Sequence, residues 1–391
     1  MLRRRVNRLG AAAALAALFL GVSTLPAGAA GAPSWQIAKM VPAVAQEFWV
    51  SASSPANAWA TGDLKLSQGT KLGVERWNGR AWQPIAAPSS LGFLDLFNPI
   101  TPVGSSSGQN AWVFPQAWRG STLRSFALHW HDGRWTTIEL PQNAAIVGTA
   151  VFSANDAWAF GSIGTGSHSA PYNLRWNGHK WRTVVLPGAV TAVNAISADN
   201  MWAIGTSTAT LNQPANRQTT LAMHWNGKAW SSVPVPVPHL PRGGGLDADL
   251  AATSGTGLWF AYINFDASGG FLSNGLLRWD GRHWHRLRMP AHFTYFLNAA
   301  VQDGHGGLWV CSPSQIYHYS AGHWTQQPTP KGQFSCNALA WIPGTKAALA
   351  AGSMWTANES DGVILRSPGQ ALEPRDKAVC SVGWGRPPPH R

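Results

Sequence analysis

The most constraining feature of this sequence is a segment that recurs along most of the chain at intervals of about 40 to 50 residues. Residues 189–238 show one copy in full, with four short stretches rich in β-branched and aromatic residues. Two tight turns and one long loop separate these stretches. Short apolar or alternating runs bounded by turn residues are typical of β-strands. Each copy is therefore predicted to be a unit of four antiparallel strands.

Aromatic residues mark three columns when the copies are aligned. The second strand carries a tryptophan, usually within the pattern W-A-x-G, and Leu349 takes this position in the last copy. The second-strand column is Trp59, Trp112, Trp158, Trp202, Trp259 and Trp309. The third strand ends in Trp77, Trp130, Trp176, Trp225, Trp279 and Tyr319. The fourth strand opens with Trp82, Trp135, Trp181, Trp230, Trp284 and Trp324. Repeats of four strands at this period are the blades of a β-propeller.

The two ends of the array complete one another. The chain starts with a lone fourth strand at residues 35–42, and its last copy has strands at 336–341, 347–353 and 363–366 but no fourth. Pairing these ends removes an open sheet edge that could template aggregation. We therefore predict an all-β, seven-bladed β-propeller with four antiparallel strands per blade, whose ring is closed by the N-terminal strand joining the last blade.

The segments at the two ends of the chain differ from the repeats in composition. Residues 1–29 combine an arginine-rich start, an apolar run and the small residues Ala27-Gly28-Ala29, as secretory signal peptides do. No later apolar run reaches the roughly 18 residues of a membrane span. The propeller is expected at residues 30–368, and a Pro-rich basic tail, expected to be poorly ordered, at 369–391. We expect a secreted, extracellular monomer without a membrane span.

The charge balance favours anionic partners. The 29 Lys and Arg against 17 Asp and Glu give a formal net charge of +12. Such a surplus suits acidic glycans or cell-envelope polymers, although it also serves solubility alone. We expect no nucleic-acid partner, no cofactor and no bound metal. A column of bases precedes the third-strand aromatic residue: Arg76, His129, Arg175, His224, Arg278 and His318, with Arg366 in the last copy. Recurrence favours stacking on a neighbouring tryptophan over an anion site.

Turn residues distinguish the two faces of the disc. Asn-Gly or Asp-Gly pairs such as Asn78-Gly79 and Asp132-Gly133 join strands three and four, as in hairpins whose central positions need φ > 0. Asn155-Asp156 is one of the turns between strands one and two. Both kinds of turn lie on one face, the short-turn face. The long-loop face collects the other connections, which vary in every blade, and variable loops on a rigid scaffold usually carry binding.

Candidate functional residues lie toward the long-loop face. Glu47 and Asp247 each precede the second-strand tryptophan of their blade by twelve residues, and Asp249 lies beside Asp247. Glycoside hydrolysis usually takes two carboxylates about 5 to 10 Å apart, so Glu47 and Asp247 are the catalytic candidates. Binding of sugar hydroxyls or a cation, here including Asp249, and plain solvation are the alternatives.

Three aromatic residues share a position in the loop between strands two and three. Trp118, Phe265 and Trp355 each follow the second-strand column position by six residues. An aromatic residue in water exposes a large apolar face, which a sugar ring could cover. We predict a ligand-binding platform at these residues, with packing against neighbouring loops as the alternative.

The thiols allow one disulfide to be predicted. Cys311 lies near the long-loop end of strand two in blade six, and Cys336 near the same end of strand one in blade seven. Export makes oxidation possible. We expect a Cys311–Cys336 disulfide, with Cys380 free.

Motifs such as SANDAWAFG followed by LRWNGHKWRTVVLP resemble the Trp-rich, kelch- or galactose-oxidase-like propellers that soil bacteria with GC-rich genomes secrete. The Gly-x-x-Trp hairpin is similar to the Asp-box of sialidase-type propellers. The resemblance covers nearly all of residues 35–367 and implies the fold without one activity, because propellers host many chemistries.

These features together favour a secreted, non-catalytic recognition module that binds carbohydrate or cell-envelope polymer through the long-loop face. A propeller glycosidase or lyase using Glu47 and Asp247 is the first alternative. A structural or protein-binding propeller is the second.

Overall fold

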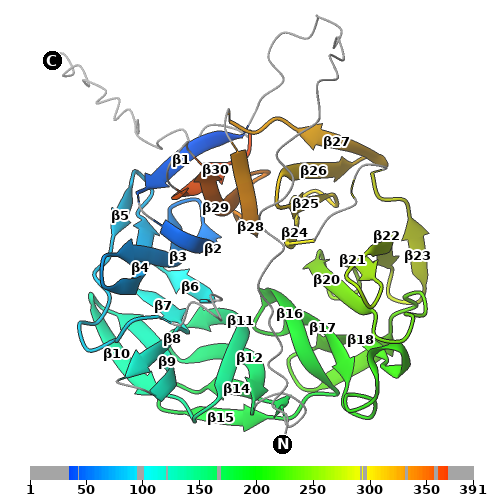
Figure 1. The fold of residues 1–391 in the computed structure, drawn as a ribbon, viewed down its shortest axis with the longest axis horizontal. Helices are drawn as coiled ribbons and strands as arrows, with labels where there is room; N and C mark the ends of the chain where they lie inside the picture. Colours follow the sequence, from blue (N-terminus) through cyan, green and yellow to red (C-terminus); the bar gives the residue numbers. More distant parts are fainter. Residues whose placement is uncertain are drawn as a thin grey trace, which may run out of the picture. The chain divides into compact units, whose positions relative to one another are not determined.

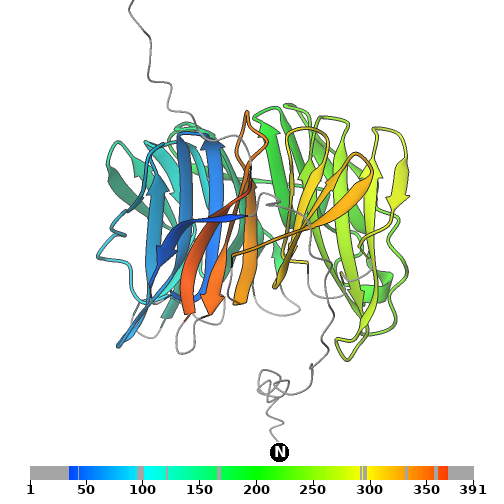
Figure 2. The ribbon, with the colours of Figure 1, turned by 90° about the horizontal axis from the view of Figure 1, so that it is seen from above.

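The structure is a computed structural model that describes residues 35–42, 44–94, 101–119, 122–164, 169–290, 293, 297–330, 333–355 and 360–368. Within these residues the strands form seven antiparallel sheets around a central channel (Figure 1). The strands of each sheet run between the two faces of a disc (Figure 2). The predicted seven-bladed propeller is therefore confirmed. The predicted signal peptide, residues 1–29, and the tail, residues 369–391, lie outside the described residues.

The first four blades follow one another along the chain. Blade one consists of β2 (Val44–Ser54), β3 (Asn57–Leu66), β4 (Gly69–Trp77) and β5 (Trp82–Pro84). Blade two consists of β6 (Val103–Ser107), β7 (Asn110–Val113), β9 (Thr122–His131) and β10 (Arg134–Glu139), with β8 (Gln116–Arg119) paired to β9. Blade three consists of β11 (Ala144–Ser153), β12 (Asp156–Ile163), β14 (Asn173–Trp176) and β15 (Trp181–Val184), with β13 (Ala170–Pro171) paired to β12. Blade four consists of β16 (Gly188–Ser197), β17 (Asn200–Ser207), β18 (Thr220–Trp225) and β19 (Trp230–Pro234), with the 3-10 helix η2 (Ala215–Arg217) before β18.

The remaining three blades complete the ring. Blade five consists of β20 (Gly245–Ala252), β21 (Leu258–Phe265), β22 (Phe271–Trp279) and β23 (Trp284–Leu287). Blade six consists of β24 (Ala299–Gln302), β25 (Leu308–Ser312), β26 (Gln315–Ser320) and β27 (His323–Gln327). Blade seven consists of β28 (Gln333–Trp341), β29 (Ala348–Trp355) and β30 (Ser360–Arg366), with β1 (Gln36–Val41) as its outer strand.

The N-terminal strand closes the ring as predicted. β1 pairs antiparallel with β30, from Gln36 opposite Arg366 to Val41 opposite Gly362. Trp35 is buried ahead of this strand, and its N–H donates to the carbonyl of Pro328 at 3.1 Å. The first and last strands of the propeller therefore share one sheet.

The second-strand tryptophans form the core between blades. Trp112, which is fully buried, meets the aromatic pair of the next blade edge-on, with ring centroids 5.0 Å from Trp176 and 4.8 Å from Trp181. The base opposite each tryptophan stacks on its other side: His129 lies 4.0 Å from Trp112, and the guanidinium of Arg175 lies 5.0 Å from the ring of Trp158. The scaffold interpretation is confirmed for the six bases of this column that lie opposite a tryptophan, whereas Arg366 lies opposite Leu349.

Most hairpins between strands three and four differ from the expected two-residue turn. Asp132 and Gly133 both have positive φ, 49° and 82°, and fit it. Ala321 and Gly322 of blade six, with φ of 49° and 85°, form a second two-residue turn. In the hairpins of blades one, three, four and five, four residues join the strands, as between Trp77 and Trp82, and only the glycine has positive φ. The reason is side-chain capping, because Asn78 Oδ1 accepts the N–H groups of Arg80 and Ala81 and stabilises the longer loop.

A disulfide joins the last two blades. Cys311 in β25 and Cys336 in β28 are bonded, with their Cα atoms 6.2 Å apart, and both residues are fully buried. The predicted pairing is confirmed. Cys380 lies outside the described residues. No helix in the described part of the chain has the length and apolar character to cross a membrane.

Candidate functional site

A pocket of about 610 Å³ opens between blades four and five at the long-loop face. Its walls come from the ends of β17 and β18, the loop that contains η2, the connection after β19 and the start of β20. Its apolar lining includes Ile204, Val235, Val237, Leu246 and Leu297. Its polar lining includes Asn216, Gln218, Thr219, His239 and Asp247. A concave site with apolar walls and a few polar groups is the usual form of a small-ligand site.

The loop that forms the outer wall of this pocket is held by its own side chains. The Gln218 side-chain amide donates to the carbonyls of Leu211 and Gln213, at 3.0 and 2.9 Å. The N–H of Thr219 donates to the hydroxyl of Thr210 at 2.9 Å. The wall is therefore braced before any ligand binds, which lowers the entropy cost of binding.

Asp247 is the one carboxylate in the described lining of this pocket. Burial raises its pKa above the ordinary value for Asp. Its carboxylate has no hydrogen bond or ion pair within the described part of the chain, and no Lys or Arg is among the described lining residues. A half-buried carboxylate without a partner favours a ligand that brings hydrogen-bond donors or a positive charge.

Asp249 lies two residues further along β20 but faces the central channel. This channel holds a cavity of about 240 Å³ lined by the inner strands of all seven blades. One carboxylate oxygen of Asp249 accepts the N–H of Ala300 in blade six at 2.7 Å, and the other accepts the N–H of Leu250 at 2.8 Å. Asp249 therefore joins blades five and six. Its role in ligand binding stays a prediction.

Polar side chains make further links of this kind around the channel. Asn194 Oδ1 in blade four accepts the N–H of Ala252 in blade five at 3.3 Å. The Asn298 amide donates to the carbonyl of Cys336 in blade seven at 2.6 Å. The polar residues around the channel therefore hold adjacent blades together as well as lining a cavity.

Stability should depend on pH through Asp249. Burial raises its pKa to about 7, although the N–H groups of Leu250 and Ala300 lower it in part. Ionisation is thus unfavourable in the folded state, so stability falls as pH rises from about 4 to about 7 and levels off above. His129, whose pKa burial and His131 lower to about 4, acts in the opposite sense below pH 6.5.

A variant isolates the Asp249 contribution. The difference in melting temperature between Asp249→Asn and the wild type should move in favour of the variant by a few degrees between about pH 5 and about pH 8. Thermal unfolding of both proteins across this range measures it. A difference that is the same at every pH would show that Asp249 does not titrate there.

The structure does not describe the proposed carboxylate pair. Asp247 lies in blade five, opposite Ile263. Glu47 falls in the irregular part of the pairing between β2 and β3, and its side chain lies outside the described residues. Blades one and five are not neighbours in the ring. The catalytic role of Glu47 and Asp247 stays a hypothesis.

The three predicted platform residues lie in strands rather than in irregular loops. Trp118 is in β8 opposite Leu123, Phe265 ends β21 and Trp355 ends β29. Backbone pairing between strands two and three continues further into the hairpin than expected, so the strands include these residues. Trp355 is 55% exposed and Trp118 38% exposed, whereas Phe265 is half-buried against the core between blades five and six. They occupy blades two, five and seven, so no two are in adjacent blades.

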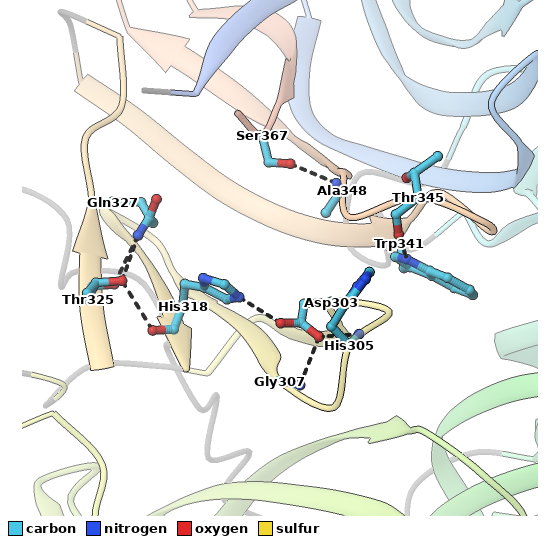
Figure 3. A network of polar contacts seen from close by, with 10 residues as sticks. All are labelled: Asp303, His305, Gly307, His318, Thr325, Gln327, Trp341, Thr345, Ala348 and Ser367. Carbon is cyan, nitrogen blue, oxygen red and sulfur yellow. Dashed lines mark hydrogen bonds and ion pairs between the residues drawn. The ribbon is translucent and has the colours of Figure 1, made fainter. Parts of the chain in front are cut away.

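Acidic residues on the short-turn face are engaged in turns, as expected. Burial would raise the pKa of Asp303, but hydrogen bonds from His318 at 2.9 Å and from the N–H groups of His305 and Gly307 lower it (Figure 3). Arg175 similarly donates to both oxygens of Asp156, at 3.0 and 3.2 Å. Among the described residues, no three His, Cys, Asp or Glu side chains converge as metal ligands.

Sequence patterns missed most of the pocket wall. Asn216, Gln218 and His239 lie in connections that repeat in no other blade, so an alignment of the copies leaves them out. The available signal was the length of the connection between β17 and β18 together with its amide and hydroxyl side chains. That signal indicates a binding loop, but it does not show that Asp247 of blade five forms the opposite wall of the pocket.

No protein-family model matches the chain, and no curated protein matches it. Solved structures match in fold. A structure described as YCF48 bound to D1 peptide aligns with a TM-score of 0.56 at 14% identity, over 85% of this chain and 96% of that one. YCF48 from Cyanidioschyzon merolae aligns with a TM-score of 0.53 at 16% identity, over 85% and 98%. The GH74 xyloglucanase from Xanthomonas campestris aligns with a TM-score of 0.51 at 15% identity, over 82% and 53%. Such likenesses establish the β-propeller architecture and no activity.

Proposed function

We propose that this chain is a secreted, non-catalytic recognition module that binds carbohydrate or a cell-envelope polymer through its long-loop face. The observation that carries the proposal is the unpaired Asp247 carboxylate in the pocket between blades four and five. Sugar hydroxyls donate to carboxylates, and the C–H faces of a sugar ring pack on apolar walls such as Ile204 and Val237. We further infer that the repeats are of the Trp-rich, kelch- or galactose-oxidase-like class, from their W-A-x-G strands and Gly-x-x-Trp hairpins.

Binding is favoured over hydrolysis by the number of carboxylates. Both common mechanisms of glycoside hydrolysis use an acid and a second carboxylate about 5 to 10 Å away. Among the described residues that line the pocket, Asp247 is the single carboxylate. A recognition role needs no second acid, because hydrogen bonds from the Asn216 amide and to the side-chain oxygen of Gln218, whose N–H groups brace the loop, suffice to orient a ligand.

A peptide ligand is the competing proposal. The solved structure of YCF48 contains a bound D1 peptide on a propeller of similar architecture. In this chain an extended peptide would have donors for Asp247 in its N–H groups. A carbohydrate is preferred because the pocket is bounded by blades on two sides and by the braced loop, and has the form of a small-ligand site.

The test begins with a glycan array screened with the protein from residue 30 onward, beside a chromatographic search for hydrolysis products. Calorimetry on the best glycan then compares Asp247→Asn with the wild type. We expect a loss of roughly ten- to a hundredfold in affinity, because a hydrogen bond to a charged group contributes about 1.5 to 3 kcal/mol.

The matched control is Asp199→Asn, which changes the same charge at an exposed turn on the short-turn face and should leave affinity unchanged. Cleaved glycan would favour the enzyme alternative. A glycan whose affinity ignores Asp247→Asn would place the binding site elsewhere, and failure of every glycan to bind would contradict the proposal.

A further inference from the structure

Six of the seven seams between blades are filled by an indole. In each, the second-strand tryptophan of one blade packs against aromatic residues of the next. Trp158 lies 5.2 Å from Trp225 and 6.0 Å from Trp230, and Trp59 lies 5.9 Å from Trp130. The same packing recurs for Trp112, Trp202, Trp259 and Trp309. The indole is therefore the standard filler of a seam.

The seventh seam lacks this filler. Leu349 takes the second-strand position in blade seven and packs in one cluster with Trp77 and Trp82 of blade one. These two rings are 6.0 Å apart, and no indole of the described residues lies between them and blade seven. A pocket of about 310 Å³ lies at this seam, lined by Trp77, Trp82, Ile342 and Leu349 among others. This volume is within the usual range for small-molecule sites.

The pocket opens on the short-turn face. Pro55 and Arg80, which line it, lie in the two hairpin turns of blade one. The Trp77 indole N–H donates to the Pro55 carbonyl at 2.9 Å, which holds the ring in place. Ile37 of the closing strand, 46% exposed, is at its edge. The site is therefore separate from the long-loop pocket and does not rest on the proposed function.

Because blade seven has Leu349 where the other blades have a tryptophan, a cation in this blade also loses its usual stacking partner. In every blade the third-strand base lies opposite the second-strand residue, as Arg175 lies opposite Trp158 and Arg366 opposite Leu349. In the other six blades this base stacks on a tryptophan ring: Arg76 on Trp59, His129 on Trp112, Arg175 on Trp158, His224 on Trp202, Arg278 on Trp259 and His318 on Trp309. Among the described residues, no aromatic ring stacks on the Arg366 guanidinium, and Arg366 lines the pocket instead.

Arg366 is a cation with no counter-charge in the part of the chain that the structure describes. Burial lowers the pKa of Arg366 below its ordinary value. Within the described residues its guanidinium has no ion pair, and the described lining of the pocket includes no acidic residue. A partly buried cation is unfavourable unless an anion or a π-face compensates it. The same pocket thus presents open aromatic edges and an uncompensated charge.

We propose that the seam between blades seven and one is a binding site for a small aromatic acid. The flat ring of the ligand occupies the position of the missing indole against Trp77 and Trp82. Its carboxylate pairs with the Arg366 guanidinium, whose planar fork matches a carboxylate bidentately. Arg80, exposed in the hairpin at the pocket, adds a second positive charge. The ligand therefore supplies the ring that the other six seams supply internally, and it compensates the Arg366 cation by charge where those seams do so by stacking.

The experiment uses indole-3-acetate as the probe and its uncharged amide, indole-3-acetamide, as the matched probe, with calorimetry and ligand-observed NMR as readouts. Indole-3-acetate should bind the wild type with a dissociation constant in the millimolar range or below, and more tightly than the amide. Arg366→Gln should weaken binding of the acid by roughly tenfold or more and leave the amide unaffected.

Leu349→Trp restores the indole of the other seams and should abolish binding of both probes while the melting temperature is kept or raised. The control is Arg175→Gln, the same change at a filled seam, which should bind the acid as the wild type does. Should Leu349→Trp fail to fold, Arg366→Gln decides alone. Absence of binding to the wild type, or equal binding of the acid by either seam variant, would overturn the proposal.

Discussion

Deletion of residues 30–42 should make the protein aggregate and lose its cooperative thermal unfolding. The deletion removes β1, whose pairing from Gln36 to Val41 covers the outer edge of β30. It also removes Trp35, which is 1% exposed and lies 5.3 Å from Trp309 in blade six. An uncovered strand edge is a template for association with other chains, and an uncovered aromatic core adds apolar surface. Size-exclusion chromatography and circular-dichroism melting measure both effects.

Two point variants on the same segment serve as the control for this deletion. Trp35→Ala should lower stability by about 3 to 5 kcal/mol, because it empties a buried indole site. Ile37→Ala, two residues further on, should change much less, since Ile37 is 46% exposed. If the deleted protein stays monomeric with an unchanged melting temperature, β1 is not what closes the ring in solution.

Trp202→Ala should destabilise the protein by about 3 to 5 kcal/mol, whereas Trp118→Ala and Trp355→Ala should cost about 1 kcal/mol or less. Trp202 is 3% exposed, stacks on His224 at 4.5 Å and donates its indole N–H to the Ser254 carbonyl of the next blade at 3.1 Å. Its removal leaves a cavity between two sheets and an unpaired carbonyl. Trp118 and Trp355 leave much of their rings in solvent. Chemical denaturation of the three variants measures the contrast.

The same variants test the predicted platform. An aromatic residue that stacks on a ligand ring contributes about 1 to 3 kcal/mol, so removal of Trp118 or Trp355 should weaken glycan binding by roughly ten- to a hundredfold. The two residues lie in blades two and seven, apart from each other and from the pocket between blades four and five, so the effect is expected for a polymer that spans the long-loop face and not for a short glycan held at Asp247. If either substitution costs as much stability as Trp202→Ala, or neither changes affinity, these rings are packing residues only.

The candidate sites were only partly predictable from sequence, because neighbouring residues have different surroundings. Asp247 and Asp249 are two residues apart on one strand, where alternation places them on the same side. Yet Asp247 lines the pocket against the loop of blade four, while Asp249 accepts an N–H from β24 in blade six. Over these two residues the strand passes from the mouth of the propeller into the channel. The local sequence pattern does not show how deep in the channel each residue lies.

The sequence alone determined the architecture, since each blade repeats the same local interactions within its strands and turns. Strand-length apolar runs, capped hairpins and a tryptophan at a constant spacing specify a four-stranded unit, and the incomplete units at the two ends specify closure and the count of seven. Tertiary structure alone decided the sites, because both lie between blades. The long-loop pocket needs a loop of blade four beside Asp247 of blade five, and the seam pocket needs Leu349 and Arg366 beside Trp77. Leu349 and Arg366 lie 272 and 289 positions after Trp77 in the sequence. Closure of the ring brings them beside Trp77, because each intervening blade adds its share of the curvature.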